Sequence, residues 1–194
     1  MLDTPTSPAL TSAKPPLAVD LDGTLIRCDV FTEHIVRLGF EQPWRLPQLA
    51  AWLMRGRAHA KARLAEMFPL HAAALPYDER VVAWLREEKA QGRTIALATA
   101  SDRRAATAVA EHLGCFDAVF ASDGQTNLKS RRKAEALTSA YPQGYAYAGN
   151  ERADLKVWRA ASQAVVVNAR DGLAREAASR FTVERTFEPT HGVL

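Results

Sequence analysis

Two carboxylates stand two residues apart at the end of an apolar run, in the segment LAVDLDGTL at residues 17–25. Burying a charge is unfavourable unless a partner compensates it, so Asp20 and Asp22 need a chemical reason to be there. In such a pair, one carboxylate can attack phosphorus while the other handles protons. Gly23 would let the backbone turn sharply and stay close to a phosphate. The segment therefore indicates phosphoryl chemistry, although a DG pair flanked by apolar residues is also a hairpin signal.

Further polar residues follow other apolar runs of the chain. They are Thr99 after TIALA, Asn150 and Asp154 after YAYAG, and the lysines Lys129 and Lys133 before or at the start of a predicted helix. In open α/β sheets, sites form at the carboxyl ends of the strands, so we expect these side chains to converge on one edge. Oxygen ligands of this kind suit Mg²⁺, which usually binds one or two carboxylates together with water and phosphate oxygens.

The elements that would position these residues are short strands alternating with helices. Strands are expected at 17–21, 94–99, 117–122, 145–149, 164–168 and 181–187, and helices at 101–114 (with Ser101 as N-cap), 130–141, 151–162 and 171–179. This alternation predicts βαβ units, hence an α/β fold with a Rossmann-like parallel sheet covered on both faces.

The domain organisation follows from the same patterns. Residues 1–16 are rich in Pro, Ser and Thr and are predicted to be a disordered tail. Residues 17–30 and 92–190 form the predicted core. Residues 31–91 are predicted to be a small helical cap with a connecting helix that begins at Asp78, because a structureless loop of that length is implausible in a compact domain.

Composition narrows the function classes. The formal net charge of +3 is too small to indicate nucleic-acid binding without a basic patch. No run approaches the ~20 apolar residues of a membrane-spanning helix, and the N-terminus lacks the pattern of a secretory signal. The two cysteines, Cys28 and Cys115, fit no metal motif and indicate free thiols in a reducing, cytoplasmic compartment.

The predicted cap carries basic and aromatic residues together. Residues 41–66 hold five Lys or Arg against two Glu, with Trp44, Trp52 and Met54 among them. An ordinary amphipathic cap, apolar inside and basic outside, explains this pattern. The alternative is a surface that meets an anionic substrate, a fused domain or the inner face of a membrane.

Taken in order, four motifs resemble those of the haloacid dehalogenase-like (HAD) superfamily of phosphohydrolases. They are DLDGT at 20–24, the strand that ends at Thr99, a lysine near a helix start (Lys133 in KAEAL, or its rival Lys129 in NLKS), and GNERAD at 149–154. The helical insert resembles the cap of the phosphoserine phosphatase-like branch. DLDGTLIR, LATASD, SDGQTNLK and ADLKVWRAA are more closely similar to the HAD-like domain that precedes UbiA-type membrane prenyltransferases.

The resemblance implies a role for each matching residue. Asp20 would be the nucleophile that forms an aspartyl-phosphate, and Asp22 would protonate the leaving oxygen and then activate water. Thr99 and Lys133 would hold the phosphoryl oxygens, and Lys133 would neutralise the charge that develops during transfer. The implied activity is that of a phosphatase acting on a small-molecule or lipid-linked phosphate ester.

The implied Mg²⁺ ligands are Asp20, the Asp22 backbone carbonyl and Asn150, with Asp154, or Asp154 and Glu151 together, as compensating acids. The family usually has Asp where this chain has Asn150, so weaker Mg²⁺ binding is expected. Asp29 stands nine residues after Asp20, where phosphoserine phosphatases carry a Glu that reads the substrate amine. With Gly23 and Lys129, it completes the predicted substrate contacts.

Two other functions compete with the phosphatase. One is a catalytically weakened binding or regulatory module that docks a membrane prenyltransferase. The other is a C–halogen hydrolase, which Asp22 disfavours because the dehalogenases of this superfamily lack the second aspartate.

Overall fold

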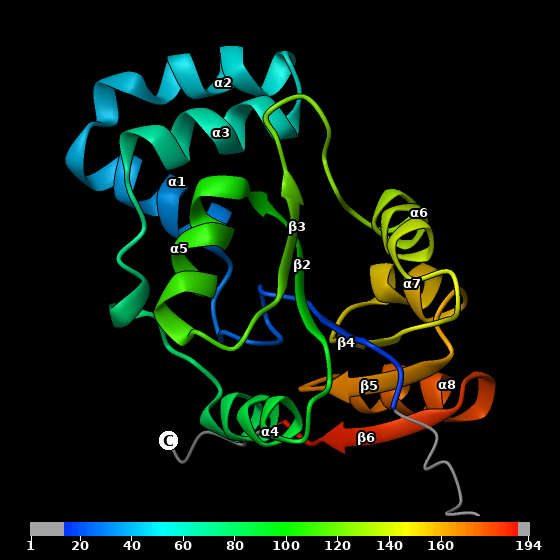
Figure 1. Cartoon of the computed structure of the whole chain (residues 1–194). Helices are drawn as coiled ribbons and strands as arrows, with labels where there is room; N and C mark the ends of the chain where they lie inside the picture. The colour runs from blue at the N-terminus through cyan, green and yellow to red at the C-terminus, as the bar shows by residue number, and fades with distance from the viewer. Residues whose placement is uncertain (1–13, 190–194) are drawn as a thin grey trace, which may run out of the picture.

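A single parallel sheet organises the molecule. The computed structural model describes residues 14–189. Its six strands lie in the order β3-β2-β1-β4-β5-β6 (Figure 1). Their bounds are β1 Leu17–Val19, β2 Ile95–Asp102, β3 Ala118–Ser122, β4 Ala146–Gly149, β5 Gln163–Val167 and β6 Val183–Phe187. From β1 the chain builds β2 and β3 on one side and then crosses to β4 on the other, which confirms the α/β prediction and opens a crevice between the ends of β1 and β4. Because β1 pairs in parallel with both β2 and β4, the hairpin reading of residues 20–24 is wrong.

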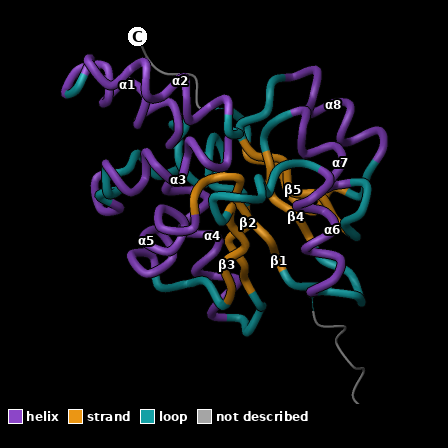
Figure 2. The backbone as a smooth tube through the Cα atoms, turned by 90° about the horizontal axis from the view of Figure 1, so that it is seen from above, coloured by secondary structure: helices purple, strands orange, loops and turns teal. Residues whose placement is uncertain are grey.

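The helices cover both faces of this sheet (Figure 2). Leu17 and Val19 point to one face and Ala18 to the other, as alternation along a strand requires. The first face packs against α4 (Glu79–Ala90) and α5 (Arg103–Leu113). The second face packs against α6 (Arg131–Ala140), α7 (Leu155–Trp158) and α8 (Asp171–Arg180). Burial on both faces explains why the strands read as continuous apolar runs.

The insert after β1 forms a helical unit, here called the cap (residues 30–75). It contains α1 (Val30–Glu41), α2 (Leu46–Met54), α3 (Arg57–Met67) and the short 3₁₀ turns η1 (Pro43–Arg45) and η2 (Ala72–Ala74). The cap has a hydrophobic cluster of its own, which includes Leu38, Trp52 and Leu64. Pro43 and Pro47 stand in the first turns of η1 and α2, where a missing N–H does no harm.

The two chain segments that join cap and core lie side by side. Ile26 and Tyr77 form an antiparallel bridge. The Arg27 N–H donates to the Pro76 carbonyl and the Asp78 N–H to the Leu25 carbonyl, both at 2.9 Å. The chain therefore leaves and re-enters the core through one hydrogen-bonded pair of segments, here called the neck. Asp78 caps α4 as its position predicts, because its side chain accepts the Arg80 N–H.

Several element boundaries differ from the sequence-based expectations. β2 continues to Asp102, and Asp102 rather than Ser101 caps α5, because its carboxylate accepts the Arg104 N–H at 3.0 Å. The helix expected at 151–162 is a 3₁₀ turn, η3 (Arg152–Asp154), followed by the short α7; in the turn, the Asp154 N–H donates to the Glu151 carbonyl three residues earlier at 2.9 Å.

The last residues of the predicted N-terminal tail contact the core. Residues 1–13 of the predicted tail, and residue 190 of the predicted core, lie outside the described residues. The Pro15 carbonyl accepts from Arg93 at 2.8 Å, and the Pro16 carbonyl accepts the Ala146 N–H at 2.8 Å, so the chain is fixed to the core just before β1.

Within residues 14–189, no helix is both long enough and apolar enough to cross a membrane.

Candidate active site

A cavity of about 460 Å³ lies where β1 and β4 end. All the sequence-predicted site residues except Thr99 line it, namely Asp20, Asp22, Gly23, Asp29, Lys129, Lys133, Asn150 and Asp154. The cap contributes Phe31, Arg57 and Lys61 to the lining. The crevice expected from the strand order is thus a partly open cavity with charged walls.

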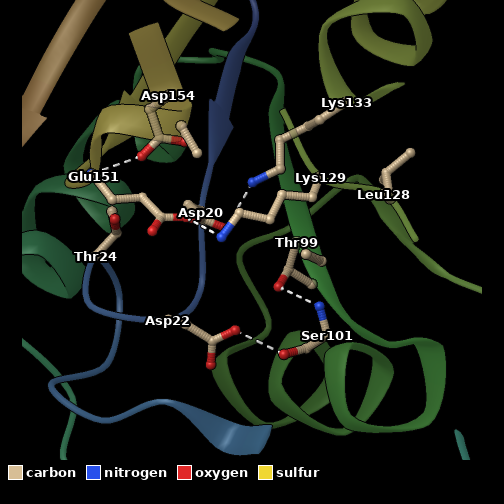
Figure 3. Close-up of polar contacts among 12 residues, drawn as sticks. Asp20, Asp22, Thr24, Thr99, Ser101, Leu128, Lys129, Lys133, Glu151 and Asp154 are labelled. Carbon is tan, nitrogen blue, oxygen red and sulfur yellow. Dashed lines mark hydrogen bonds and ion pairs between the residues drawn. The ribbon is translucent and has the colours of Figure 1, made fainter. Parts of the chain in front are cut away.

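Asp20 follows β1 directly, and its N–H donates to the Ala148 carbonyl of β4 at 3.0 Å. Its Oδ1 accepts from Lys133 Nζ at 2.8 Å (Figure 3), and both side chains are almost fully buried. Lys133 reaches this point from the first turn of α6. Lys129 is half exposed and pairs instead with Glu151 at 2.8 Å. The geometry therefore brings Lys133, not its rival, to the candidate nucleophile.

A buried tyrosine extends this pair. Lys133 Nζ also donates to the Tyr147 hydroxyl at 2.7 Å, and that hydroxyl donates to Asp154 Oδ1 at 2.9 Å. Burial raises the pKa of Tyr147 well above its usual value, so the hydroxyl keeps its proton. Tyr147 does not stand out in the sequence as a site residue because it lies in an apolar strand. The available signal was that a tyrosine in such a strand needs a polar partner for its hydroxyl.

Asp154 organises the loop after β4. Its Oδ2 accepts the backbone N–H groups of Asn150 and Glu151, each at 2.9 Å. A Cβ on Gly149 would lie 2.6 Å from that oxygen, so the glycine permits this approach. Burial, and secondly the charge of Asp20, raise the pKa of Asp154 to about 6. Both oxygens are thus engaged in positioning, and a direct role as metal ligand stays a prediction.

Asn150 faces Gly23 and Thr24, in the turn that follows Asp20 and Asp22. Its Oδ1 accepts from the Thr24 hydroxyl at 3.3 Å. Gly23 has a φ of +74°, and a Cβ there would lie 2.1 Å from Asn150 Nδ2. A side chain at position 23 would therefore be strained by its own backbone and would displace the amide.

Asp22 is held by the cap and by β2 together. Its Oδ1 accepts the Val30 N–H at 2.8 Å and its Oδ2 accepts from the Ser101 hydroxyl at 2.7 Å (Figure 3). Thr99 is fully buried, and its hydroxyl accepts the Ser101 N–H at 3.0 Å. Because β2 continues past Thr99, the hydroxyl that touches a catalytic candidate is that of Ser101. The role of Thr99 in holding phosphoryl oxygens stays a prediction.

Burial, opposed by the Val30 hydrogen bond and reinforced by the charge of Asp20, raises the pKa of Asp22 from 3.8 to about 6. This carboxyl therefore keeps its proton in the folded protein at pH values where the unfolded chain has lost it. Such a group stabilises the fold at low pH, and that stabilisation is lost as the pH rises through about 4 to 6.

We expect the Asp22→Asn protein, measured in metal-free buffer, to lack this loss. The asparagine can accept the Val30 N–H with its Oδ1 and donate from its Nδ2 to the Ser101 hydroxyl, but it cannot ionise. The variant should therefore gain roughly 2–3 kcal/mol on the wild type above pH 6 and little at pH 4. Urea unfolding at a series of pH values measures the difference. A stability difference that does not change with pH would contradict the raised pKa.

The cap presents two cations to the cavity. Lys61 Nζ donates to the Ala100 carbonyl of β2 at 2.7 Å. Arg57 and Lys61 both lie over the Phe31 ring, 5.6 and 5.7 Å from its centroid. Burial lowers the pKa of Lys61. In the sequence, Arg57 and Lys61 belong to a basic segment of the cap, and no pattern marks them as the two residues that face the cavity.

Asp29 lines the same cavity and also caps a helix of the cap. Its Oδ1 accepts the Thr32 N–H at 2.7 Å, so it is the N-cap of α1 as well as a residue of the cavity wall.

The donor set of the cavity fits Mg²⁺. Among residues 14–189, no three His, Cys, Asp or Glu side chains gather closely enough to hold a metal by themselves. An amide and a carbonyl would have to complete the site, and Asn150 and Asp22 place such oxygens beside Asp20 in one cavity. The charge of Asp20 contributes to the raised pKa values of both Asp22 and Asp154, and a bound cation would relieve that repulsion.

Comparison with known proteins identifies relatives. Residues 17–159 match the model of the family of haloacid dehalogenase-like hydrolases. The uncharacterised protein y4nM of Sinorhizobium fredii is 40% identical over 167 residues, 86% of this chain but only 32% of the relative. The chain therefore spans about a third of the length of that relative.

Two solved structures share the fold at low sequence identity. A substrate-bound phosphoserine phosphatase is 16% identical with a TM-score of 0.63, and the match covers 90% of this chain and 93% of that one. A phospho-aspartyl intermediate analogue of phosphoserine phosphatase is 17% identical with a TM-score of 0.62, covering 91% and 94%.

Proposed function

Because the chain belongs to the haloacid dehalogenase-like hydrolase family, we propose that it is a Mg²⁺-dependent phosphatase that hydrolyses a phosphomonoester through an aspartyl-phosphate intermediate. The observation that carries the proposal is the buried pair of Asp20 and Lys133 at the wall of a cavity that also contains Asp22. A buried carboxylate with one oxygen fixed by a lysine is an oriented nucleophile. The fold of a phospho-aspartyl intermediate analogue agrees with this chemistry.

In the first step, an Asp20 oxygen attacks phosphorus, and the bond between phosphorus and the ester oxygen breaks. Asp22, which holds a proton up to about pH 6, gives it to the departing alcohol oxygen. In the second step, Asp22 takes a proton from water as that water attacks the aspartyl-phosphate, which releases inorganic phosphate and restores Asp20. Lys133 neutralises negative charge on the phosphoryl oxygens in both steps. When bound, Mg²⁺ would supply further charge neutralisation through Asp20, the Asp22 carbonyl and Asn150.

Cations in the cavity wall favour an anionic substrate. Arg57 and Lys61 of the cap and Lys129 of the core line the cavity beside the carboxylates, so a small or lipid-linked phosphate ester would find positive charge there. The test of the proposal is turnover of p-nitrophenyl phosphate and of a panel of phosphorylated metabolites, each with and without Mg²⁺.

The Asn150→Asp exchange is expected to lower the Mg²⁺ concentration that gives half-maximal activity, by roughly tenfold, because a carboxylate binds the cation more strongly than an amide. Asn127→Asp is the matched control, since it adds the same charge to the wall of the same cavity. Titration of activity with Mg²⁺ measures both. Equal shifts in the two variants would mean that Asn150 acts only through the general field of the cavity and is not a ligand.

A second candidate is a binding module with weakened turnover. The neutral Asn150 favours it, and so does the greater length of the curated relative, of which this chain spans 32%. Association with a UbiA-type prenyltransferase remains a prediction from the sequence resemblance. Absence of turnover across the whole ester panel, with retained binding of a phosphorylated ligand, would favour this module over the phosphatase.

A further inference from the structure

The outermost helix of the cap exposes apolar residues to solvent. α2 lies above α3, on the side of the cap away from the sheet (Figure 1). Leu49 and Trp52 turn inward and are buried in the cluster of the cap. The other residues of LPQLAAWLM are exposed, and none of them carries a charge. A surface helix normally carries polar side chains on its solvent face, so this helix is exceptional.

Large apolar side chains make up much of this exposed surface. Met54 is 89% exposed and Trp44, in the turn before α2, is 71% exposed. Leu46 and Leu53 are seven residues apart, hence on one side of the helix, and are also exposed. We call these four residues, with the helix between them, the α2 face. Contiguous exposed apolar surface of this kind marks an interaction site more often than not.

The charge at the borders of the α2 face has one sign. Arg45 and Arg55 stand at the two ends of α2 and are exposed. Residues 42–65 contain five basic residues and no Asp or Glu. In the described part of the chain, the nearest ion pairs, Arg37 with Glu41 and Arg63 with Glu66, leave Arg45 and Arg55 without an acid. The partner of this surface must therefore supply the negative charge.

We propose that the α2 face binds the surface of an anionic lipid bilayer. α2 would lie in the plane of the membrane, with Trp44, Leu53 and Met54 in the boundary between headgroups and acyl chains. Arg45 and Arg55 would meet lipid phosphates at its two ends. Binding of a protein to a membrane surface is strongest when buried apolar area and attraction to anionic lipids act together.

A second copy of the chain fits the same surface poorly. A symmetric dimer through the α2 face would bring Arg45 and Arg55 of one copy close to the same arginines of the other, because a two-fold interface uses one patch twice. Like charges brought together across an interface oppose association. A bilayer with anionic headgroups would cover the apolar side chains and also pair with the two arginines.

The test is co-sedimentation of the whole protein with lipid vesicles, either of phosphatidylcholine alone or of phosphatidylcholine mixed with phosphatidylglycerol. We expect binding to the mixed vesicles, weaker binding to phosphatidylcholine alone, and release by salt. The double variant Arg45→Gln/Arg55→Gln should lose roughly 30-fold in partitioning, since two surface arginines are removed. Leu53→Gln/Met54→Gln should lose binding to a similar degree while keeping the melting temperature, because both side chains are exposed.

The control pair is Arg86→Gln/Arg175→Gln, which removes the same charge from exposed positions on α4 and α8. These helices lie at the opposite end of the molecule from α2 (Figure 1), so vesicle binding should not change. Failure of the wild type to bind anionic vesicles would overturn the proposal, as would equal losses in the control pair. A wild-type dimer in sedimentation velocity that Leu53→Gln/Met54→Gln converts to monomer would show that the face binds a second copy instead.

Discussion

The Asp20→Asn protein is expected to lose Mg²⁺-dependent hydrolysis of p-nitrophenyl phosphate by at least about 1,000-fold. An amide cannot displace the ester oxygen from phosphorus, so the covalent step is removed rather than slowed. The position of Asp20 makes the loss specific, because its Oδ1 is fixed by Lys133 and its backbone by Ala148. Other carboxylates of the cavity are placed differently: Asp22 is bonded to Val30 and Ser101, and Asp154 to the loop that it organises. Glu151 also pairs with a lysine, Lys129, but both of these side chains are half exposed.

Two controls separate a chemical effect from a folding effect. Asp20→Asn leaves the buried Lys133 without its carboxylate, so the melting temperature and circular dichroism of the variant must be measured beside its activity. Glu87→Gln, at an exposed position near the end of α4, also removes one negative charge, and α4 leads into β2 at the edge of the sheet opposite the site, so this variant should keep full activity. A folded Asp20→Asn protein with more than a few per cent of wild-type turnover would exclude the aspartyl-phosphate mechanism.

The second large effect concerns the two lysines. Lys133→Met should reduce kcat/KM by roughly 100- to 1,000-fold, because the cation that faces the phosphoryl oxygens is lost from a buried site. It should also destabilise the protein by about 3 kcal/mol or more, since Asp20 and the Tyr147 hydroxyl lose their shared buried partner. Methionine keeps the length of the side chain and so limits the change in packing.

Lys129→Met is the matched variant in the same cavity. Its ion pair with Glu151 is half exposed and contributes at most about 1 kcal/mol, and we expect a change of only a few-fold, mainly in KM. Steady-state kinetics and thermal unfolding of both variants measure the contrast. A larger loss of kcat in Lys129→Met than in Lys133→Met would reverse the assignment of the catalytic lysine.

The fold was predictable because its signals are local. Short apolar runs alternate with helical patterns, and parallel strands must then be crossed over by helices that cover both faces. The convergence of Asp20, Lys133 and Asn150 on one cavity followed from the rule that strand ends share an edge, without any knowledge of their contacts.

The rest depends on contacts between residues far apart in the chain. Ser101 reaches Asp22 because β2 continues for three residues past Thr99, and no periodicity in the sequence marks where that strand ends. Tyr147 reads as a core residue, and only its hydrogen bonds to Lys133 and Asp154 reveal a polar task. Lys61 faces the site only because α3 packs above β2, which depends on how the whole cap folds.

The hydrogen-bonded neck fixes where the cap leaves and rejoins the core, but other contacts tie the cap to the reaction itself. At the Ile26–Tyr77 bridge, the outgoing and returning chains are joined as neighbouring strands, about 5 Å apart. A tight turn between Arg27 and Pro76 could therefore close the chain without the cap. The shortened protein would lose the Val30 N–H that holds Asp22 and the Lys61 contact to β2. A cap of another sequence could replace this one only if it also supplied a backbone donor to Asp22, so the part that selects the ester and the carboxylate that moves the proton must change together.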